Sequence, residues 1–151
     1  PYDSHACTLR EFLNESPNST WDIAQATFSL QSINPDERKS QLTWLRKVSP
    51  RLLVAEFDVP TFSAIGAPDH VRHVKNRYER GLAEYAQSPL VKQGFLVPIM
   101  LDYFNRSSAK TNYEQPIDSW VEDLKEAGFS RIEKHAIYDY WWAPAYLLDA
   151  C

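Results

Sequence analysis

Apolar positions in the first part of the chain switch from strand-like to helical spacing and back, which predicts a β–α–β unit. Residues 21–30 are rich in β-branched and aromatic side chains, as in a buried strand. Asn34 and Pro35 suit the cap and first position of a helix, which apolar residues at helical spacing extend to Val48. Residues 52–55 are apolar without a break, as in a central parallel strand. This order of elements is typical of an α/β fold.

Residues 66–112 form a predicted helical insertion after this unit. Pro68 begins a helix with a single apolar stripe, and the basic and histidine side chains around the stripe are typical of a solvated face. The stripe consists of Val71, Val74, Tyr78, Leu82 and Tyr85. Residues 90–104 are mostly apolar and fit either a helix or a strand, whereas residues 105–112 are polar, as in a loop.

The last third of the chain predicts a helix followed by a β-hairpin. Apolar residues keep helical spacing over 117–127, and Gly128 stands where a helix commonly ends in a left-handed conformation. Residues 130–140 read as a strand, and their many charges favour an edge position in the sheet. Residues 145–150 form a final, mostly apolar strand. Because the connection between the two strands is short, we expect them to be antiparallel.

The order of these elements resembles the second half of a known enzyme family. The stretch Leu124-Lys-Glu-Ala-Gly-Phe129, followed by a charged strand and an apolar one, is similar to the end of class I (Rossmann-like) S-adenosylmethionine-dependent methyltransferases. In that family a helix with this ending leads into the sixth strand, and a hairpin returns as the antiparallel seventh. Residues 21–30 and 51–60 look like the fourth and fifth strands.

The resemblance implies an α/β fold with a partial Rossmann-like methyltransferase sheet, in which the strands correspond to the fourth to the seventh. A helical insertion and a C-terminal antiparallel hairpin complete this fold, in one domain over residues 1–151. Residues 66–112 would then be a lid or insertion over the substrate. The implied reaction of the complete protein is methyl transfer from S-adenosylmethionine to a small-molecule acceptor.

In this family a glycine-rich loop after the first strand cradles the cofactor, and an acidic residue at the end of the second strand binds its ribose. Neither has a counterpart here. The chain has four glycines, none of them spaced as Gly-x-Gly, and no strand–loop–helix unit precedes residue 21. We therefore expect this chain to supply the acceptor-side half, to bind S-adenosylmethionine weakly or not at all by itself, and to self-associate or pair with a missing N-terminal half. The alternative is a catalytically inactive methyltransferase-like binding or scaffold module, which pairs with another subunit.

The ends of the two predicted parallel strands supply the candidate catalytic and cofactor residues. In open α/β sheets, ligands bind in the crevice outside the carboxyl ends of the strands. The resemblance therefore assigns Gln25, Ala26 and Thr27 to the cofactor side and Phe28 to the acceptor side, although Phe28 also suits the core. Glu56 and Asp58 end the next strand, where a carboxylate can deprotonate an acceptor. Capping or an ion pair is the simpler explanation of these two carboxylates.

Two further groups are candidates for binding the acceptor. His70, His73 and Tyr78 lie on the first helix of the insertion, where a lid would cover the substrate, and the two histidines lack an evident third metal ligand. We therefore expect no metal.

The other group is the run Tyr138-Asp-Tyr-Trp-Trp142, which is unusually aromatic for a strand-to-strand turn. Tyr140, Trp141 and Trp142 would form an apolar wall for the acceptor, or would pack against the insertion.

Composition and charge limit the classes of partner that this chain can bind. Hydrophobic residues make up 44% and charged residues 24% of the 151, as in a globular protein. The net charge of -4 argues against a nucleic-acid partner, because phosphate binding needs a basic surface. No run of about 18 apolar residues is present, so we expect no membrane span. Cys7 and Cys151 fit free thiols in a cytoplasmic protein better than a disulfide.

Overall fold

The strands of the chain form one mixed sheet in the computed structural model, which describes residues 3–15, 19–104 and 112–151. The order across the sheet is β1 (Ala24–Thr27), β2 (Leu52–Phe57), β4 (Pro144–Ala150) and β3 (Ile132–Asp139). β1 and β2 are parallel, and β4 runs antiparallel to both β2 and β3. β3 therefore runs in the same direction as β1 and β2. This arrangement confirms the predicted partial sheet with its C-terminal antiparallel hairpin.

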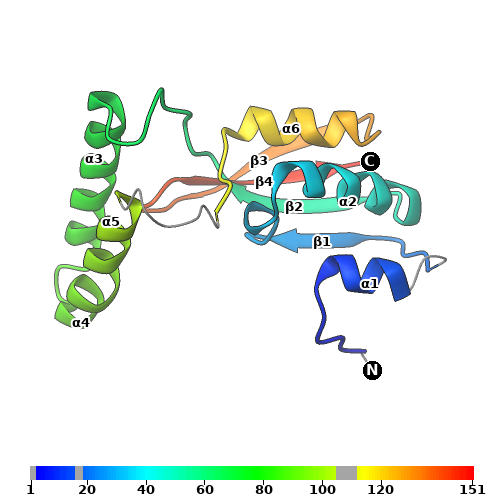
Figure 1. The fold of residues 1–151 in the computed structure, drawn as a ribbon, viewed down its shortest axis with the longest axis horizontal. Coiled ribbons are helices and arrows are strands. Elements are labelled where there is room, and N and C mark those ends of the chain that lie inside the picture. Colours follow the sequence, from blue (N-terminus) through cyan, green and yellow to red (C-terminus); the bar gives the residue numbers. More distant parts are fainter. Residues whose placement is uncertain (1–2, 16–18, 105–111) are drawn as a thin grey trace.

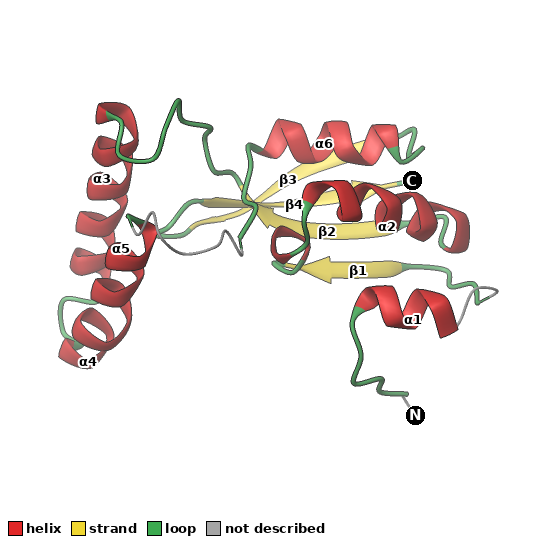
Figure 2. Ribbon diagram, viewed as in Figure 1, coloured by secondary structure: helices red, strands yellow, loops and turns green. Residues whose placement is uncertain are grey.

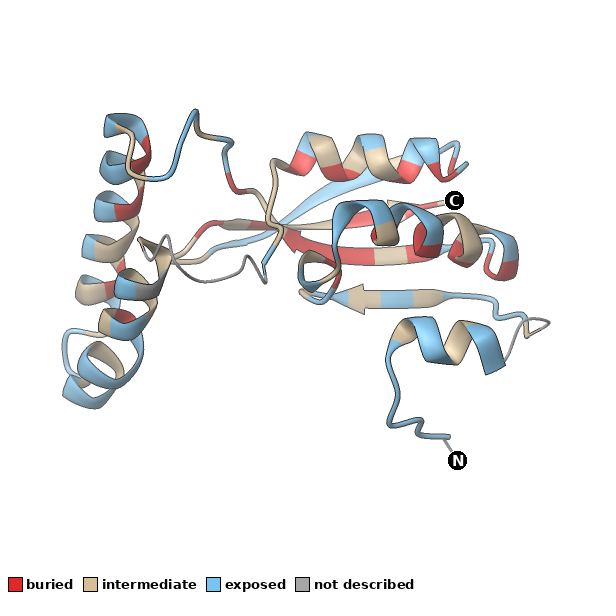
Figure 3. Cartoon of the chain, in the orientation of Figure 1, coloured by how far each residue is buried: buried red, intermediate tan, exposed pale blue. Residues whose placement is uncertain are grey.

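Helices α2 (Pro35–Val48) and α6 (Ile117–Glu126) cover one face of this sheet (Figures 1 and 2). The core lies between them and the strands, and Trp120, Leu42 and Leu148 are among its fully buried side chains. Figure 3 shows the buried colour along β2 and at intervals on both helices. The opposite face is different, because side chains such as Gln25 and His135 are exposed there. Helix α1 (Leu9–Glu15) lies beside β1 (Figure 1).

The first strand differs from its prediction in both length and burial. A buried strand over residues 21–30 was expected, but β1 covers only Ala24–Thr27 and alternates between half-buried and exposed positions. Trp21 and Ile23 are 37% and 46% exposed. The physical reason is that β1 pairs only with β2 within the described residues, so it is an edge strand. Apolar composition alone does not reveal whether a strand has a neighbour on each side.

The structure confirms the sequence signals for the start of α2, the end of α6 and the edge position of β3. The Asn34 side chain accepts a hydrogen bond from the backbone N–H of Asp36 at 3.0 Å and so caps α2, with Pro35 in the first turn. Gly128, which follows the C-cap residue Ala127 of α6, adopts a φ of 102°. This is the left-handed conformation that the C-terminal glycine signal predicts. β3 lies at the other edge of the sheet, as its charged side chains indicated.

The insertion is helical and lies at the far end of the β3–β4 hairpin (Figure 1). It comprises α3 (Pro68–Glu84), α4 (Pro89–Val91), a π-helical turn (Lys92–Leu96) and α5 (Val97–Tyr103). Residues 90–104, which fitted either helix or strand, are thus helical up to Tyr103. Pro98 lacks an N–H and cannot donate to the preceding turn, which explains why the wider π turn stands just before it. Most of the predicted polar loop, residues 105–111, lies outside the described residues.

Candidate functional site

Three aromatic rings meet where β1, β2 and β3 end. Phe28 stacks on Phe57 with ring centroids 4.5 Å apart, and Tyr140 meets both rings edge-on, at 6.4 Å and 5.8 Å. We call these three residues the rim cluster. All three side chains are half-buried. The carboxyl end of parallel strands is where open α/β sheets bind ligands. The rim cluster is therefore the candidate acceptor site.

Phe28 reaches this cluster through an unusual backbone conformation. Its φ is 48°, the only positive value among the non-glycine residues that the structure describes. Strict alternation along β1 would turn residue 28 toward the helix-covered face, as for Ala24 and Ala26. The left-handed turn instead accompanies a ring stacked on Phe57, which projects from the opposite face of β2. A bulky residue in this region costs about 1–3 kcal/mol, and such strain concentrates at functional sites.

Phe57 was not among the predicted site residues. It directly follows Glu56 at the end of a β-strand, and the alternation of side chains along that strand puts it on the other face. This position at the strand end is the signal from which Phe57 could have been predicted. It indicates which face of the sheet carries the ring, but not that the ring stacks on Phe28. Phe28 and Tyr140 were both predicted for the acceptor side, and the structure brings them together.

Glu56 is fully buried and turned toward the helix-covered side of the sheet. One of its carboxylate oxygens accepts hydrogen bonds from the backbone N–H groups of Leu30 and Gln31, at 3.0 Å and 3.3 Å. The other oxygen is buried without a hydrogen-bond partner. Burial raises the pKa of this carboxyl group to about 7, although the two backbone donors and the charge of Arg38 oppose the shift. The geometry is that of a cap on the turn after β1, and a catalytic role for Glu56 stays a prediction.

Asp58 is half-buried at the end of the same strand. Its Oδ1 accepts a hydrogen bond from the backbone N–H of Ile117 at 2.9 Å, at the first residue of α6. A carboxylate at a helix N-terminus satisfies a free donor and is favoured by the helix dipole. Asp58 therefore makes the capping contact that was the simpler expectation. It remains closer to solvent than Glu56, so of the two predicted bases it is the more accessible one.

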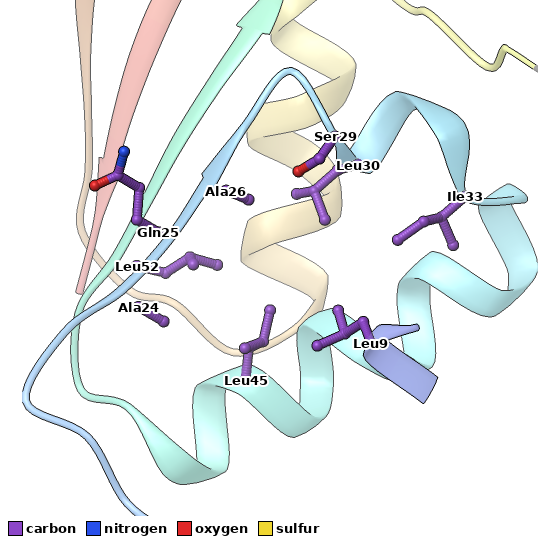
Figure 4. Close-up of a pocket in the computed structure, with 9 residues that line it drawn as sticks. All are labelled: Leu9, Ala24, Gln25, Ala26, Ser29, Leu30, Ile33, Leu45 and Leu52. Atoms are coloured by element: carbon purple, nitrogen blue, oxygen red, sulfur yellow. The ribbon is translucent and has the colours of Figure 1, made fainter. Parts of the chain in front are cut away.

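The predicted cofactor residues do not form a shared site within the described chain. The side-chain amide of Gln25 donates to the hydroxyl of Thr27 at 3.0 Å, on the exposed face of β1. Ala26 points the other way, into an apolar cavity of about 330 Å³ between β1, α1 and α2 (Figure 4). The cavity is lined by Leu9, Ala24, Gln25, Ala26, Ser29, Leu30, Ile33, Leu45 and Leu52. This lining offers packing surface and few polar partners for a cofactor.

The two histidines of the insertion lie in different surroundings from the solvated face that was expected. His70 is only 2% exposed, its ring stacks on Tyr103, and its Nδ1 accepts a hydrogen bond from the backbone N–H of Gly66 at 2.9 Å. Burial lowers the pKa of His70. The expectation of a solvated face was wrong for His70 because α5 folds back over this side of α3. His73 is half-buried beside Phe62, with ring centroids 5.2 Å apart.

The remaining predicted acceptor residues divide between the rim and the insertion. Trp142 packs edge-on against Tyr103 at 4.8 Å, and its indole N–H donates to Glu114 at 2.6 Å. The ring of Trp141 lies against Gly81 of α3. Both tryptophans therefore pack against the insertion, whereas Tyr140 is part of the rim cluster. Tyr78 is half-buried on α3.

Comparison with protein-family models and with curated proteins gives no match. Among solved structures, an O-methyltransferase family protein from Burkholderia thailandensis matches 99% of this chain with a TM-score of 0.51 at 12% sequence identity. The chain has a class I methyltransferase-like fold. It spans 34% of the length of that protein, so the fold is partial.

Other solved structures match with lower TM-scores and similar sequence identity. They include PigF with SAH, with a TM-score of 0.49 at 13% identity over 87% of this chain and 30% of that one. Another is magnesium protoporphyrin IX methyltransferase (ChlM) from Synechocystis PCC 6803 with bound SAH, with a TM-score of 0.44 at 12% identity over 88% and 45%.

The described ranges contain neither a cluster of metal ligands nor a membrane-spanning helix. No three His, Cys, Asp or Glu side chains gather there as the ligands of a metal ion would. None of the helices in those ranges is long and apolar enough to span a bilayer.

Proposed function

We propose that this chain forms the acceptor-side half of an S-adenosylmethionine-dependent methyltransferase that acts on a small molecule. The methyltransferase-like fold supports this proposal. The observation that carries it is the rim cluster, because three aromatic rings from separate parts of the chain meet at the carboxyl ends of the parallel strands. An apolar wall at that edge suits an acceptor that must be held in line with a methyl donor.

The proposed roles of the site residues follow from their surroundings. Phe28, Phe57 and Tyr140 hold the acceptor by ring contacts. His73 and Tyr78, both half-buried on α3, are the candidate acceptor residues of the insertion. Asp58 is the candidate base, since its carboxylate is half-exposed near the rim. A base within reach of an acceptor hydroxyl or amine takes up the proton that the acceptor loses on methylation. Glu56 fixes the turn that follows β1 and thereby the position of Phe28.

The described residues do not fit the whole of S-adenosylmethionine. Gln25 and Thr27 bond to each other, and the cavity beside Ala26 is apolar. Neither offers the row of backbone donors and the acidic ribose ligand that the family resemblance implies. The donor site of the complete protein would therefore have to come mainly from chain outside these residues.

The outer edge of β1 is suited to pairing with a further strand. Ala24 donates its N–H to the carbonyl of Arg51, directly before β2, and Phe28 donates to Ala55 of β2. The two-residue period therefore turns the N–H groups of Gln25 and Thr27 to the free edge. An apolar cavity lies directly beside this edge. A strand with alternating apolar side chains would satisfy the free backbone groups and fill the cavity. We propose that the missing N-terminal half supplies this strand.

The test is a methyl-transfer assay on the complete protein, with radiolabelled S-adenosylmethionine and a panel of small aromatic alcohols and amines. The proposal expects transfer to at least one compound. Tyr140→Ala should raise the KM for that compound while leaving the KM for S-adenosylmethionine nearly unchanged. Equal changes in both constants, or an unchanged acceptor KM, would contradict the role of the rim cluster.

A catalytically inactive binding or scaffold module is the second candidate. One observation favours it: both predicted bases accept backbone hydrogen bonds in caps. This alternative expects no methyl transfer to any compound in the panel, even with saturating donor. Binding of an aromatic compound without turnover, detected by quenching of tryptophan fluorescence, would support it over the enzyme.

A further inference from the structure

The tip of the β3–β4 hairpin is held by α3 in addition to the pairing of its two strands. The register of the β3–β4 pair shifts between Ala136 and Tyr138, close to the tip. Beyond that irregularity, the backbone carbonyls of Asp139, Tyr140 and Trp142 all accept hydrogen bonds from arginines of α3. These carbonyls are therefore satisfied by side chains that come from about 60 residues earlier in the sequence.

Arg77 makes most of these contacts. Its Nε donates to the carbonyl of Trp142 at 2.7 Å, and its Nη2 donates to the carbonyl of Tyr140 at 2.8 Å and to the carboxylate of Asp139 at 2.9 Å. Its side chain is only 16% exposed. Arg80, one turn further along, donates to both the carboxylate and the carbonyl of Asp139. The planar fork of an arginine can serve several acceptors at once, which a lysine ammonium at the same place cannot do with the same geometry.

The arginine contacts fix the residue that faces the acceptor site. Tyr140 is held at its carbonyl by Arg77, while its ring points the other way, against Phe28 and Phe57. Trp141 adds a packing contact with the same helix, because a Cβ at Gly81 would lie only 3.0 Å from its ring. Helix α3 therefore controls the rim cluster through the hairpin.

We infer that Arg77 is a positioning residue, which sets the place of the Tyr140 ring in the rim cluster through the backbone of the hairpin tip. The relevance of that ring to an acceptor rests on the proposed function. The placement of the ring does not, so it can be tested without any methyl donor or acceptor. Failure of the test would refute the role of Arg77 and leave the proposed reaction untouched.

The experiment is ¹⁹F NMR of the chain labelled with 3-fluorotyrosine. Tyr140→Phe and Tyr146→Phe assign the two resonances that matter, because each removes one signal. Tyr146 lies in β4, where it pairs with Ala136 and packs against the helix-covered core, and it reports on the integrity of the sheet. Arg77→Lys keeps the charge but loses the fork. Arg72→Lys is the matched control, since Arg72 is an exposed residue of the same helix.

Arg77→Lys is expected to move the Tyr140 resonance toward the shift of free 3-fluorotyrosine while the Tyr146 resonance stays in place. Arg72→Lys should move neither. An unmoved Tyr140 resonance in folded Arg77→Lys would overturn the inference. If that variant fails to fold, Asp139→Asn decides: it weakens the shared anchor of both arginines at an exposed position and should move the Tyr140 resonance in the same direction by less. No movement in that variant would also refute the inference.

Discussion

Replacing Glu56 with glutamine should make the chain's stability less dependent on pH. The carboxyl group is fully buried, and burial raises its pKa from the ordinary 4.5 to about 7. Glutamine keeps an oxygen that can accept from Leu30 and Gln31 but carries no titratable proton. Its amide would occupy the place of the carboxylate oxygen that is buried without a partner. That cost does not vary with pH, so the pH-dependent part of the effect isolates the carboxyl group.

The sign and size of the effect follow from the two pKa values. Below pH 4.5 Glu56 is protonated in the folded and the unfolded chain, and it contributes no pH dependence. Between pH 4.5 and about 7 the unfolded chain has released this proton while the folded chain retains it, so the free energy of unfolding falls as the pH rises. The difference between the two pKa values corresponds to about 3 kcal/mol in the free energy of unfolding, and this amount is lost in full above pH 7.

Urea unfolding of the chain and of Glu56→Gln at pH 4.5, 6 and 8 measures this. The difference between the two proteins cancels the contribution of every other titrating group. The stability of Glu56→Gln relative to the parent should rise by about 3 kcal/mol from pH 4.5 to pH 8. A difference that stays constant over this range would refute the reasoning, because it would mean that Glu56 is not held in a buried, protonated state near neutral pH.

Three further predictions follow from the edge strand, the insertion and the rim. The isolated chain should dimerise in sedimentation experiments through β1, and Thr27→Pro, which removes a donor from the free edge, should weaken this association; a monomer at high concentration would contradict it. Gly81→Ala should be less stable to urea than Gly94→Ala by about 1–3 kcal/mol, because only Gly81 faces the ring of Trp141; equal stabilities would argue against that contact. Tyr140→Ala should cost less than the roughly 3–5 kcal/mol of a buried aromatic truncation, and a cost in that range would assign its ring to the core.

The local signals in the sequence predicted the elements and their order well. Asn34 and Gly128 act through backbone groups a few residues away, so the sequence alone contains what is needed to place them. The charges of residues 130–140 similarly report an edge strand, because an exposed edge tolerates them. The family resemblance then supplied the strand order, which no local pattern contains.

The features that were missed depend on contacts between distant residues. His70 is buried because Tyr103 folds back over it, and the apolar residues Trp21 and Ile23 are exposed because β1 has no described neighbour on its outer side. Arg77 looked like one of several basic residues on a helix, and its role depends on carbonyls more than 60 residues away. Phe57 was missed for the same reason, since its stacking on Phe28 depends on a positive φ that the sequence does not indicate.

The central claim is that this chain carries the acceptor side of a methyltransferase without a complete donor site. Calorimetric titration of S-adenosylhomocysteine into residues 1–151 tests it most directly. The account predicts no binding in the micromolar range, because the described residues offer neither the glycine-rich loop nor the acidic ribose ligand that the family resemblance implies. The complete protein, titrated in parallel, should bind with micromolar affinity. A micromolar Kd for residues 1–151 alone would contradict the account and would place a working donor site within this chain.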